Sequence, residues 1–177
     1  MFNAIEEASI TDAERIVSLV NQAYRPDASL TGWTHEAELV SGKRTSTQQV
    51  RALFKDNSTI LVMRDKDCVV ACVHIERFGY ISHIGMLATS PSVQGMGIGK
   101  HMLAAAESLA TNKYAATRLK MSILSSRPEL LAYYNRRGYV LTGNIAPYPI
   151  EAAVGVPTRK DLHVLELHKQ SIITSNC

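Results

Sequence analysis

Within the first quarter of the chain, apolar residues are spaced among polar ones as in an amphipathic helix. The apolar positions recur every three or four residues: Ile16, Leu19, Val20, Ala23. This pattern predicts a helix that buries one stripe of its surface. Thr11 and Glu14 form a capping-box pair that predicts its start, and Arg25-Pro26 predicts its end.

Shorter apolar or alternating runs predict the strands, which we place over 3–8, 58–64, 69–77, 80–89, 118–123, 139–142 and 162–168. A short helix is expected within 32–39, and Ser46 and Gln49 cap another that runs to about residue 54. Two further helices follow, one starting at 98 and one over 127–137. This order of elements predicts an α/β fold with helices packed on a mixed sheet.

Composition and charge narrow the class of protein. A chain of 177 residues, 46% hydrophobic and 20% charged, is expected to form a single globular domain over 1–177. Its net charge of +3 is scattered, without a basic stripe interleaved with aromatic residues, so we expect no nucleic-acid partner. Without an N-terminal leader or an apolar stretch of 18 residues, the expected location is the cytoplasm, away from membranes.

The cysteines do not suggest a metal site. Cys68 and Cys72 lie in an apolar run and have no matching cluster of histidine or cysteine downstream. We therefore expect no metal and interpret both residues as buried thiols.

The stretch Gln94-Gly95-Met96-Gly97-Ile98-Gly99-Lys100 follows a predicted strand and opens a predicted helix. Glycines leave backbone N–H groups uncovered, and the helix dipole adds positive potential at the same point. The pattern predicts a site for a phosphate or pyrophosphate; the alternative is a glycine-rich turn without a ligand. A P-loop fits poorly because His101 follows Gly99-Lys100, and a dinucleotide fold fits poorly because the spacing is G-x-G-x-G.

Two motifs resemble those of the GNAT N-acetyltransferase superfamily. Gln94, Gly97 and Gly99 match its Arg/Gln-x-x-Gly-x-Gly/Ala loop, and Tyr134, with Gly138-Tyr139, matches its Tyr-x-x-x-Gly-Phe/Tyr helix end. The resemblance covers nearly the whole chain. It implies a mixed, mostly antiparallel sheet of about seven strands, a splayed central parallel pair and flanking helices.

The resemblance also implies acetyl-CoA as cosubstrate. Residues 94–100 would then bind its pyrophosphate, and backbone groups of Met86, Leu87 and Ala88 would contact pantetheine. The Leu87 N–H could stabilise the oxyanion of a tetrahedral intermediate. Where family members often carry an asparagine, this chain has Arg127, so Ser125, Ser126 or Arg127 is expected to replace that contact. Arg136 and Arg137 could meet the 3′-phosphate or form a solvated helix end.

Acetyl transfer to an amine needs an acid and a base. By resemblance, Tyr134 is the acid that protonates the departing thiolate. Tyr133 is a competitor, and a purely packing role for Tyr134 is the alternative. The glutamate that many members carry on the strand before the loop is missing, so His83 is the first candidate base, followed by Glu76 and His74. Water relaying protons to solvent is another possibility.

The amine acceptor would bind to the variable helical region and the late loop. Trp33, Glu36 and Arg44 are the candidates, with Glu36 suited to a cationic amine and Arg44 to a carboxylate. The expected function is acetyl transfer from acetyl-CoA to a primary amine of a small molecule or peptide, with a homodimer possible by analogy. The rival interpretation is a catalytically weak acyl-CoA-binding regulatory module.

Overall fold

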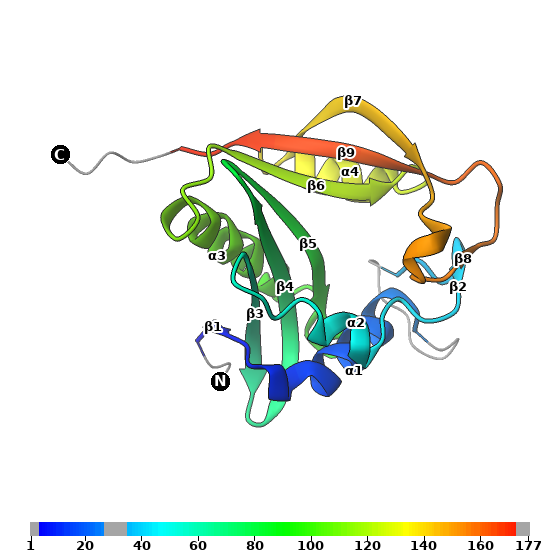
Figure 1. The fold of residues 1–177 in the computed structure, drawn as a ribbon. Helices are drawn as coiled ribbons and strands as arrows, with labels where there is room; N and C mark the ends of the chain where they lie inside the picture. Colours follow the sequence, from blue (N-terminus) through cyan, green and yellow to red (C-terminus); the bar gives the residue numbers. More distant parts are fainter. Residues whose placement is uncertain (1–3, 27–34, 173–177) are drawn as a thin grey trace.

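The computed structural model describes residues 4–26 and 35–172. The strands of its main sheet are β1 (Glu6–Glu7), β3 (Ser58–Asp65), β4 (Cys68–Phe78), β5 (Ile81–Thr89), β6 (Arg118–Leu124), β7 (Val140–Pro147) and β9 (His163–Gln170). They form one seven-stranded sheet in the order β1-β3-β4-β5-β6-β9-β7 (Figure 1). Among these seven described strands, only β5 and β6 pair in parallel. The predicted mixed, mostly antiparallel sheet is confirmed.

Within the described residues, four α-helices flank the sheet: α1 (Ala13–Tyr24), α2 (Thr47–Arg51), α3 (Ile98–Asn112) and α4 (Pro128–Asn135). α1 and α2 pack on one face, where Ile16 and Val50 join Val62 in an apolar cluster. α3 and α4 pack on the other face (Figure 1), where Met102 and Tyr134 belong to a second and larger cluster. Burying a large aliphatic side chain contributes about 1.5–3 kcal/mol, so these two clusters hold the helices against the sheet.

The sheet is interrupted at its centre. β5 and β6 pair only from Ile81–Arg118 to His83–Lys120 and then diverge (Figure 1). At the same level, the pairing of β4 with β5 jumps from Cys72–Ala88 to His74–Gly85. Met86 and Leu87 of β5 therefore lie opposite one residue of β4, as in a β-bulge, and Met86 has a positive φ of 51°. The predicted splay of the central parallel pair is confirmed.

Some local predictions were wrong. The capping box that starts the first helix is Ser9 with Asp12, which begins a 3-10 turn (η1, Ile10–Asp12) before α1. The Ser9 N–H donates to Asp12 Oδ2 over 3.0 Å, and Arg64 of β3 pairs with the same carboxylate at 2.9 Å. This tertiary ion pair favours Asp12 over the Thr11–Glu14 pair that the sequence also offers.

Two other segments also differ from expectation. In the described part of 32–39 the chain forms a turn rather than a helix, followed by β2 (Val40–Ser41), which pairs with β8 (Val156–Pro157) in a separate two-stranded sheet. Cys72 is buried as predicted, but Cys68 is exposed because it directly follows the β3–β4 turn. Among the described helices, none has the length and apolar character needed to cross a bilayer.

Candidate active site

The glycine-rich loop ends at the N-terminus of α3 and leaves donors uncovered. Gly97 is the N-cap of α3, with a φ of 78° and no side-chain cap. The first intrahelical bond there is from His101 N–H to Gly97 O, at 3.2 Å. The N–H groups of Ile98, Gly99 and Lys100 therefore have no intrahelical acceptor, as is general for a first helical turn. These converging donors suit an anion.

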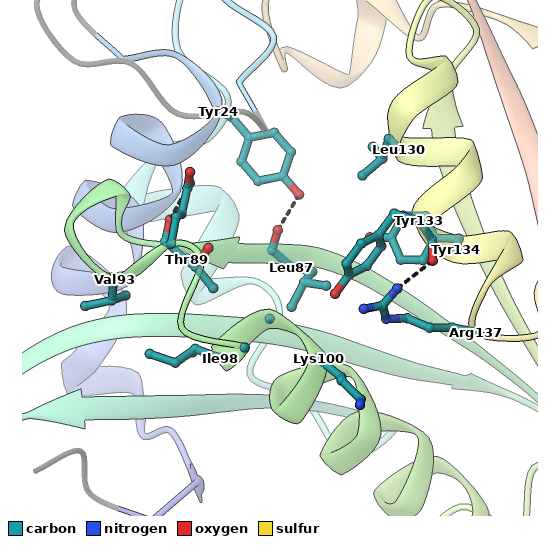
Figure 2. Close-up of a pocket in the computed structure, with 14 residues that line it drawn as sticks. Tyr24, Leu87, Thr89, Val93, Ile98, Lys100, Leu130, Tyr133, Tyr134 and Arg137 are labelled. Atoms are coloured by element: carbon teal, nitrogen blue, oxygen red, sulfur yellow. Dashed lines mark hydrogen bonds between the residues drawn. The ribbon is translucent and has the colours of Figure 1, made fainter.

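A cavity of about 290 Å³ lies over this loop, and we call it the glycine-loop cavity. Its walls include Thr89, Gly99, Lys100 and, from α4, Tyr133 (Figure 2). A Cβ at Gly99 would lie 3.6 Å from Tyr133 Oη and 3.8 Å from Thr89 Cγ2, both on the cavity wall. A residue larger than alanine at position 99 would therefore occupy space that the cavity now offers.

A second cavity, of about 270 Å³, opens where β5 and β6 diverge; we call it the interstrand cavity. His83 and Met86 of β5 and Ser122 of β6 line it. The two cavities share four residues: Tyr24, Leu87, Leu130 and Tyr134. The cavities thus meet at the bulge of β5, beneath the C-terminal end of α1.

Tyr24 at the end of α1 fixes the bulge. Its hydroxyl donates to the Leu87 carbonyl over 2.9 Å, so that tyrosine and carbonyl face each other at the junction (Figure 2). Burial raises the pKa of Tyr24, which keeps the hydroxyl protonated as a donor. Tyr24 was not among the site residues predicted from the sequence. Its spacing of four from Val20 indicates the buried stripe, but nothing in the sequence indicates a bond to Leu87.

Tyr134 is buried and packed against other aromatic rings at the junction. It is 8% exposed. Its ring lies edge-on to the rings of Tyr133 and Tyr139, with ring centres 5.2 Å and 5.9 Å away. Burial raises the pKa of Tyr134, so its hydroxyl remains protonated over the physiological range. Tyr133, the competitor, lines the glycine-loop cavity but not the interstrand cavity, and the centre of its ring lies 3.4 Å from Arg137 Cζ.

The candidate bases lie in different surroundings. His83 is half-buried and lines the interstrand cavity. Burial lowers the pKa of His83, and the carboxylates of Glu76 and Glu166 partly oppose this effect. Glu76 itself pairs with Lys55 at 2.6 Å and lines neither cavity. His74 shares a hydrogen bond of 2.7 Å with Ser58 Oγ, away from both cavities, and burial lowers its pKa to about 4.

Of the residues predicted to contact pantetheine and pyrophosphate, most line a cavity and two do not. Leu87 lines both cavities and Met86 lines the interstrand cavity, whereas Ala88 is buried in the cluster under α1 and lines neither. In the loop, every candidate from Gln94 to Lys100 except Met96 lines the glycine-loop cavity. Met96 is 58% exposed.

The candidates that would replace the family asparagine lie elsewhere. Ser126 and Arg127 line a separate hollow that Glu36 also borders. Arg127 is buried and pairs with Glu129 at 2.5 Å. Of the two arginines at the end of α4, Arg137 lines the glycine-loop cavity and Arg136 is exposed.

Two of the three candidate acceptor residues, Glu36 and Arg44, line the interstrand cavity. Trp33 lies outside the described residues. The structure adds Arg25, which pairs with Glu36 at 3.0 Å, to the same wall, and Tyr148 of the expected late loop also lines it. Arg25 immediately precedes a proline, and the sequence indicates only a helix end there.

Comparison with known families identifies the chain. The acetyltransferase (GNAT) family model matches residues 16–139, which include the glycine-rich loop and α4. The chain belongs to the GNAT acetyltransferase family. No curated protein matches the sequence.

Solved structures share the GNAT fold at low sequence identity. The ribosomal-protein-S18-alanine N-acetyltransferase from Escherichia coli is 13% identical with a TM-score of 0.72, and the match covers 100% of this chain and 99% of that one. For yncA from Salmonella typhimurium, solved with its cofactor acetyl-CoA, the identity is 18%, the TM-score 0.68 and the coverage 96% and 94%. Mutant forms of the spermidine/spermine N-acetyltransferase SpeG from Vibrio cholerae are 12% identical with a TM-score of 0.67, and the match covers 95% of this chain and 93% of that one.

Proposed function

We propose that the protein transfers an acetyl group from acetyl-CoA to a primary amine of a small molecule or peptide. The observation that carries the proposal is the meeting of two cavities at one bulge. The glycine-loop cavity ends in uncovered N–H donors, the interstrand cavity carries charged side chains, and both reach Leu87 and Tyr134. A reaction between two substrates needs such a junction, because it holds the reacting groups together.

The residues of the glycine-loop cavity fit coenzyme A. The N–H groups of Ile98, Gly99 and Lys100 suit a pyrophosphate, since they lack intrahelical acceptors and lie at the positive end of the α3 dipole. The absence of a side chain at Gly99 keeps the approach to these donors open. When bound, acetyl-CoA supplies the acetyl group as a thioester.

Two side chains can handle the protons: Tyr134 at the junction and His83 in the wall of the interstrand cavity. Burial keeps the hydroxyl of Tyr134 protonated, so that it is available as a donor to a departing sulfur. His83 has a lowered pKa and is therefore mostly neutral at pH 7, as the acceptor of an amine proton must be. His83 lines the cavity that would hold the amine, whereas Glu76 does not.

Amine-dependent release of the CoA thiol tests the proposal. The purified protein is mixed with acetyl-CoA and a panel of amines that includes amino acids, diamines and short peptides, and thiol release is followed. We expect release above the hydrolytic background with at least one class of amine. If acetyl-CoA stabilises the fold but no amine raises thiol release, the rival interpretation as a regulatory acyl-CoA-binding module replaces the enzyme.

A further inference from the structure

The charged groups of the interstrand cavity indicate which amines it accepts. The glutamate in this wall is already neutralised: Glu36 pairs with Arg25 at 3.0 Å, and their side chains are only 11% and 7% exposed. A buried carboxylate with such a partner has little left to offer a cationic amine. Glu36 is therefore a poor anchor for a second positive charge on the acceptor.

Arg25 serves mainly to hold the wall together. Besides Glu36, its guanidinium donates to the carbonyls of Gly42 at 2.8 Å and Val154 at 3.0 Å. It thereby joins the end of α1 to two distant loops. At Gly155 a Cβ would lie 2.6 Å from Arg25 Nη1, so this guanidinium packs closely against the backbone of residue 155.

Arg44 differs from Arg25 because no residue that the structure describes pairs with its charge. Its backbone is fixed to α1: the Arg44 N–H donates to Asn21 Oδ1 at 2.8 Å, and Thr45 makes two further bonds to the same asparagine. Its guanidinium lies 5.4 Å from the centre of the Tyr24 ring. Over residues 4–26 and 35–172, the structure records no hydrogen bond or ion pair for this guanidinium.

The net charge of the wall follows from these pairs. Arg25 and Glu36 cancel, and His83 has a lowered pKa and is mostly neutral at pH 7, so Arg44 leaves the described wall with one positive charge. An anionic group on the acceptor would match this charge with bidentate hydrogen bonds, whereas a polyamine would be repelled by it.

The position of Arg44 also limits the size of the acceptor. Arg44 lies against the ring of Tyr24, and the hydroxyl of the same tyrosine reaches Leu87 at the junction of the cavities. A carboxylate bound to Arg44 would thus lie beside Tyr24, the residue whose hydroxyl reaches the junction. The cavity volume of about 270 Å³ is at the lower end for small-molecule sites.

We propose that the acceptor is a small amino acid whose carboxylate binds the Arg44 guanidinium while its amine reaches the junction at Leu87. This inference rests on the proposed acetyl transfer and specifies its substrate class. The carboxylate would complete the hydrogen bonding of a fixed arginine, and a carboxylate–arginine pair is the usual anchor of this kind.

Matched pairs of acceptors test the proposal. Each L-amino acid is compared with its own amide, which has the same α-amine but no carboxylate. The nearby negative charge raises the pKa of the amine, so without recognition the less basic amide would react faster. We expect kcat/KM for the preferred acid to exceed that for its amide by about 10- to 100-fold, the range for a hydrogen bond to a charged group.

Substitution of Arg44 tests whether its side chain causes this preference for the acid. In Arg44→Gln the ratio of acid to amide should fall to 1 or below, and Arg44→Lys should keep part of the preference for the acid. Lys43→Gln removes the neighbouring exposed charge and should leave the ratio unchanged. An acetyl-CoA-induced rise in Tm that survives in Arg44→Gln shows that the variant is folded and binds the cosubstrate.

The outcomes separate this proposal from the proposed function. If the wild type acetylates amides, diamines or peptides as well as the acids, or if Arg44→Gln keeps the preference, the carboxylate anchor is wrong while acetyl transfer stands. If acetyl-CoA binds and neither acids nor amides react, the amino-acid proposal is also overturned. If acetyl-CoA does not raise the Tm of the wild type, the proposed function itself fails.

Discussion

The two cavities are built from different kinds of groups. The anion site of the glycine-loop cavity consists of backbone N–H donors of one contiguous stretch, and the conformation of Gly97 makes the helix begin there. The interstrand cavity is built from side chains that come from separate parts of the chain, among them Arg25, Arg44, His83 and Tyr148. Under the proposed function, the cosubstrate side is therefore a local property of the chain, and the acceptor side is a tertiary one.

The difference has a practical consequence. A contact made by the backbone is insensitive to side-chain replacement unless the new side chain occupies the space of the ligand. A contact made by a side chain is lost when that side chain is changed. Variants on the two sides should therefore separate binding of acetyl-CoA from turnover of the acceptor, and residues at the junction should affect both.

Tyr134→Phe should show the largest effect and sharpens the comparison at the junction. Removing the hydroxyl removes a general acid, which is typically worth about 10²–10⁴-fold, so we expect kcat to fall by about 10³-fold while acetyl-CoA still raises the Tm. Steady-state kinetics and thermal melts measure the two effects. Tyr133→Phe is the matched control, and a larger loss in that variant would contradict the assignment of Tyr134.

His83→Gln tests the acceptor side through pH. Burial lowers the pKa of His83 below 6.5, so the neutral base is present above that pH and is lost as the pH falls. The wild-type profile of kcat/KM should show an acidic limb below pH 6.5, and His83→Gln should lose both this limb and about 10²-fold in rate. His101→Gln, on the exposed surface of α3, serves as the control. An acidic limb that persists in His83→Gln would rule out His83 as the base.

Substitutions at Gly99 test the cosubstrate side by filling space. Gly99→Ala places a Cβ at ordinary contact distance from Tyr133 Oη, and should bind acetyl-CoA normally. Gly99→Val adds two methyl groups there and should weaken binding about 10- to 100-fold, in line with overpacking of 1–3 kcal/mol. Both residues favour a helix over glycine, so loss of folding is not expected. Titration calorimetry measures the affinity, and equal affinities for the two variants would contradict the placement of the cosubstrate.

Tyr24→Phe should have the smallest effect on activity, but it should affect the glycine-loop cavity and the interstrand cavity at once. It removes one hydrogen bond, from Tyr24 to the Leu87 carbonyl at 2.9 Å, which is worth about 0.5–1.5 kcal/mol. We expect a loss of about 2- to 13-fold in kcat/KM and a fall in Tm of a few degrees. Tyr80→Phe, at a residue 74% exposed, should change neither. An unchanged kcat/KM in Tyr24→Phe would show that the bulge is held in place without this bond.

The same local and tertiary division decides what the sequence could predict. The glycine-rich loop and the α4 motif are each one continuous stretch of sequence. Their residues could therefore be predicted as parts of a site. The capping box at Ser9 could not be preferred over the one at Thr11, because Arg64 on β3 decides between them. β2 and β8 contain two residues each, which is too short for any periodic signal.

Which side chains reach the site also depends on tertiary partners. His83 lines the interstrand cavity and Glu76 does not, although the two are direct partners across β4 and β5. The difference arises because Lys55 draws the Glu76 carboxylate into an ion pair at 2.6 Å. Such a partner, on another segment, carries no sequence signal near Glu76.

The most direct test of the account is a thermal melt of the wild-type protein with acetyl-CoA, with NAD and ATP as parallel controls. At about 100 times the dissociation constant, a ligand of the folded state adds about 2.7 kcal/mol. For a chain of this size we predict a rise in Tm of about 5–11 °C with acetyl-CoA and none of that size with NAD or ATP. No rise with acetyl-CoA, or a larger rise with NAD or ATP, would contradict the assignment of the glycine-loop cavity to coenzyme A.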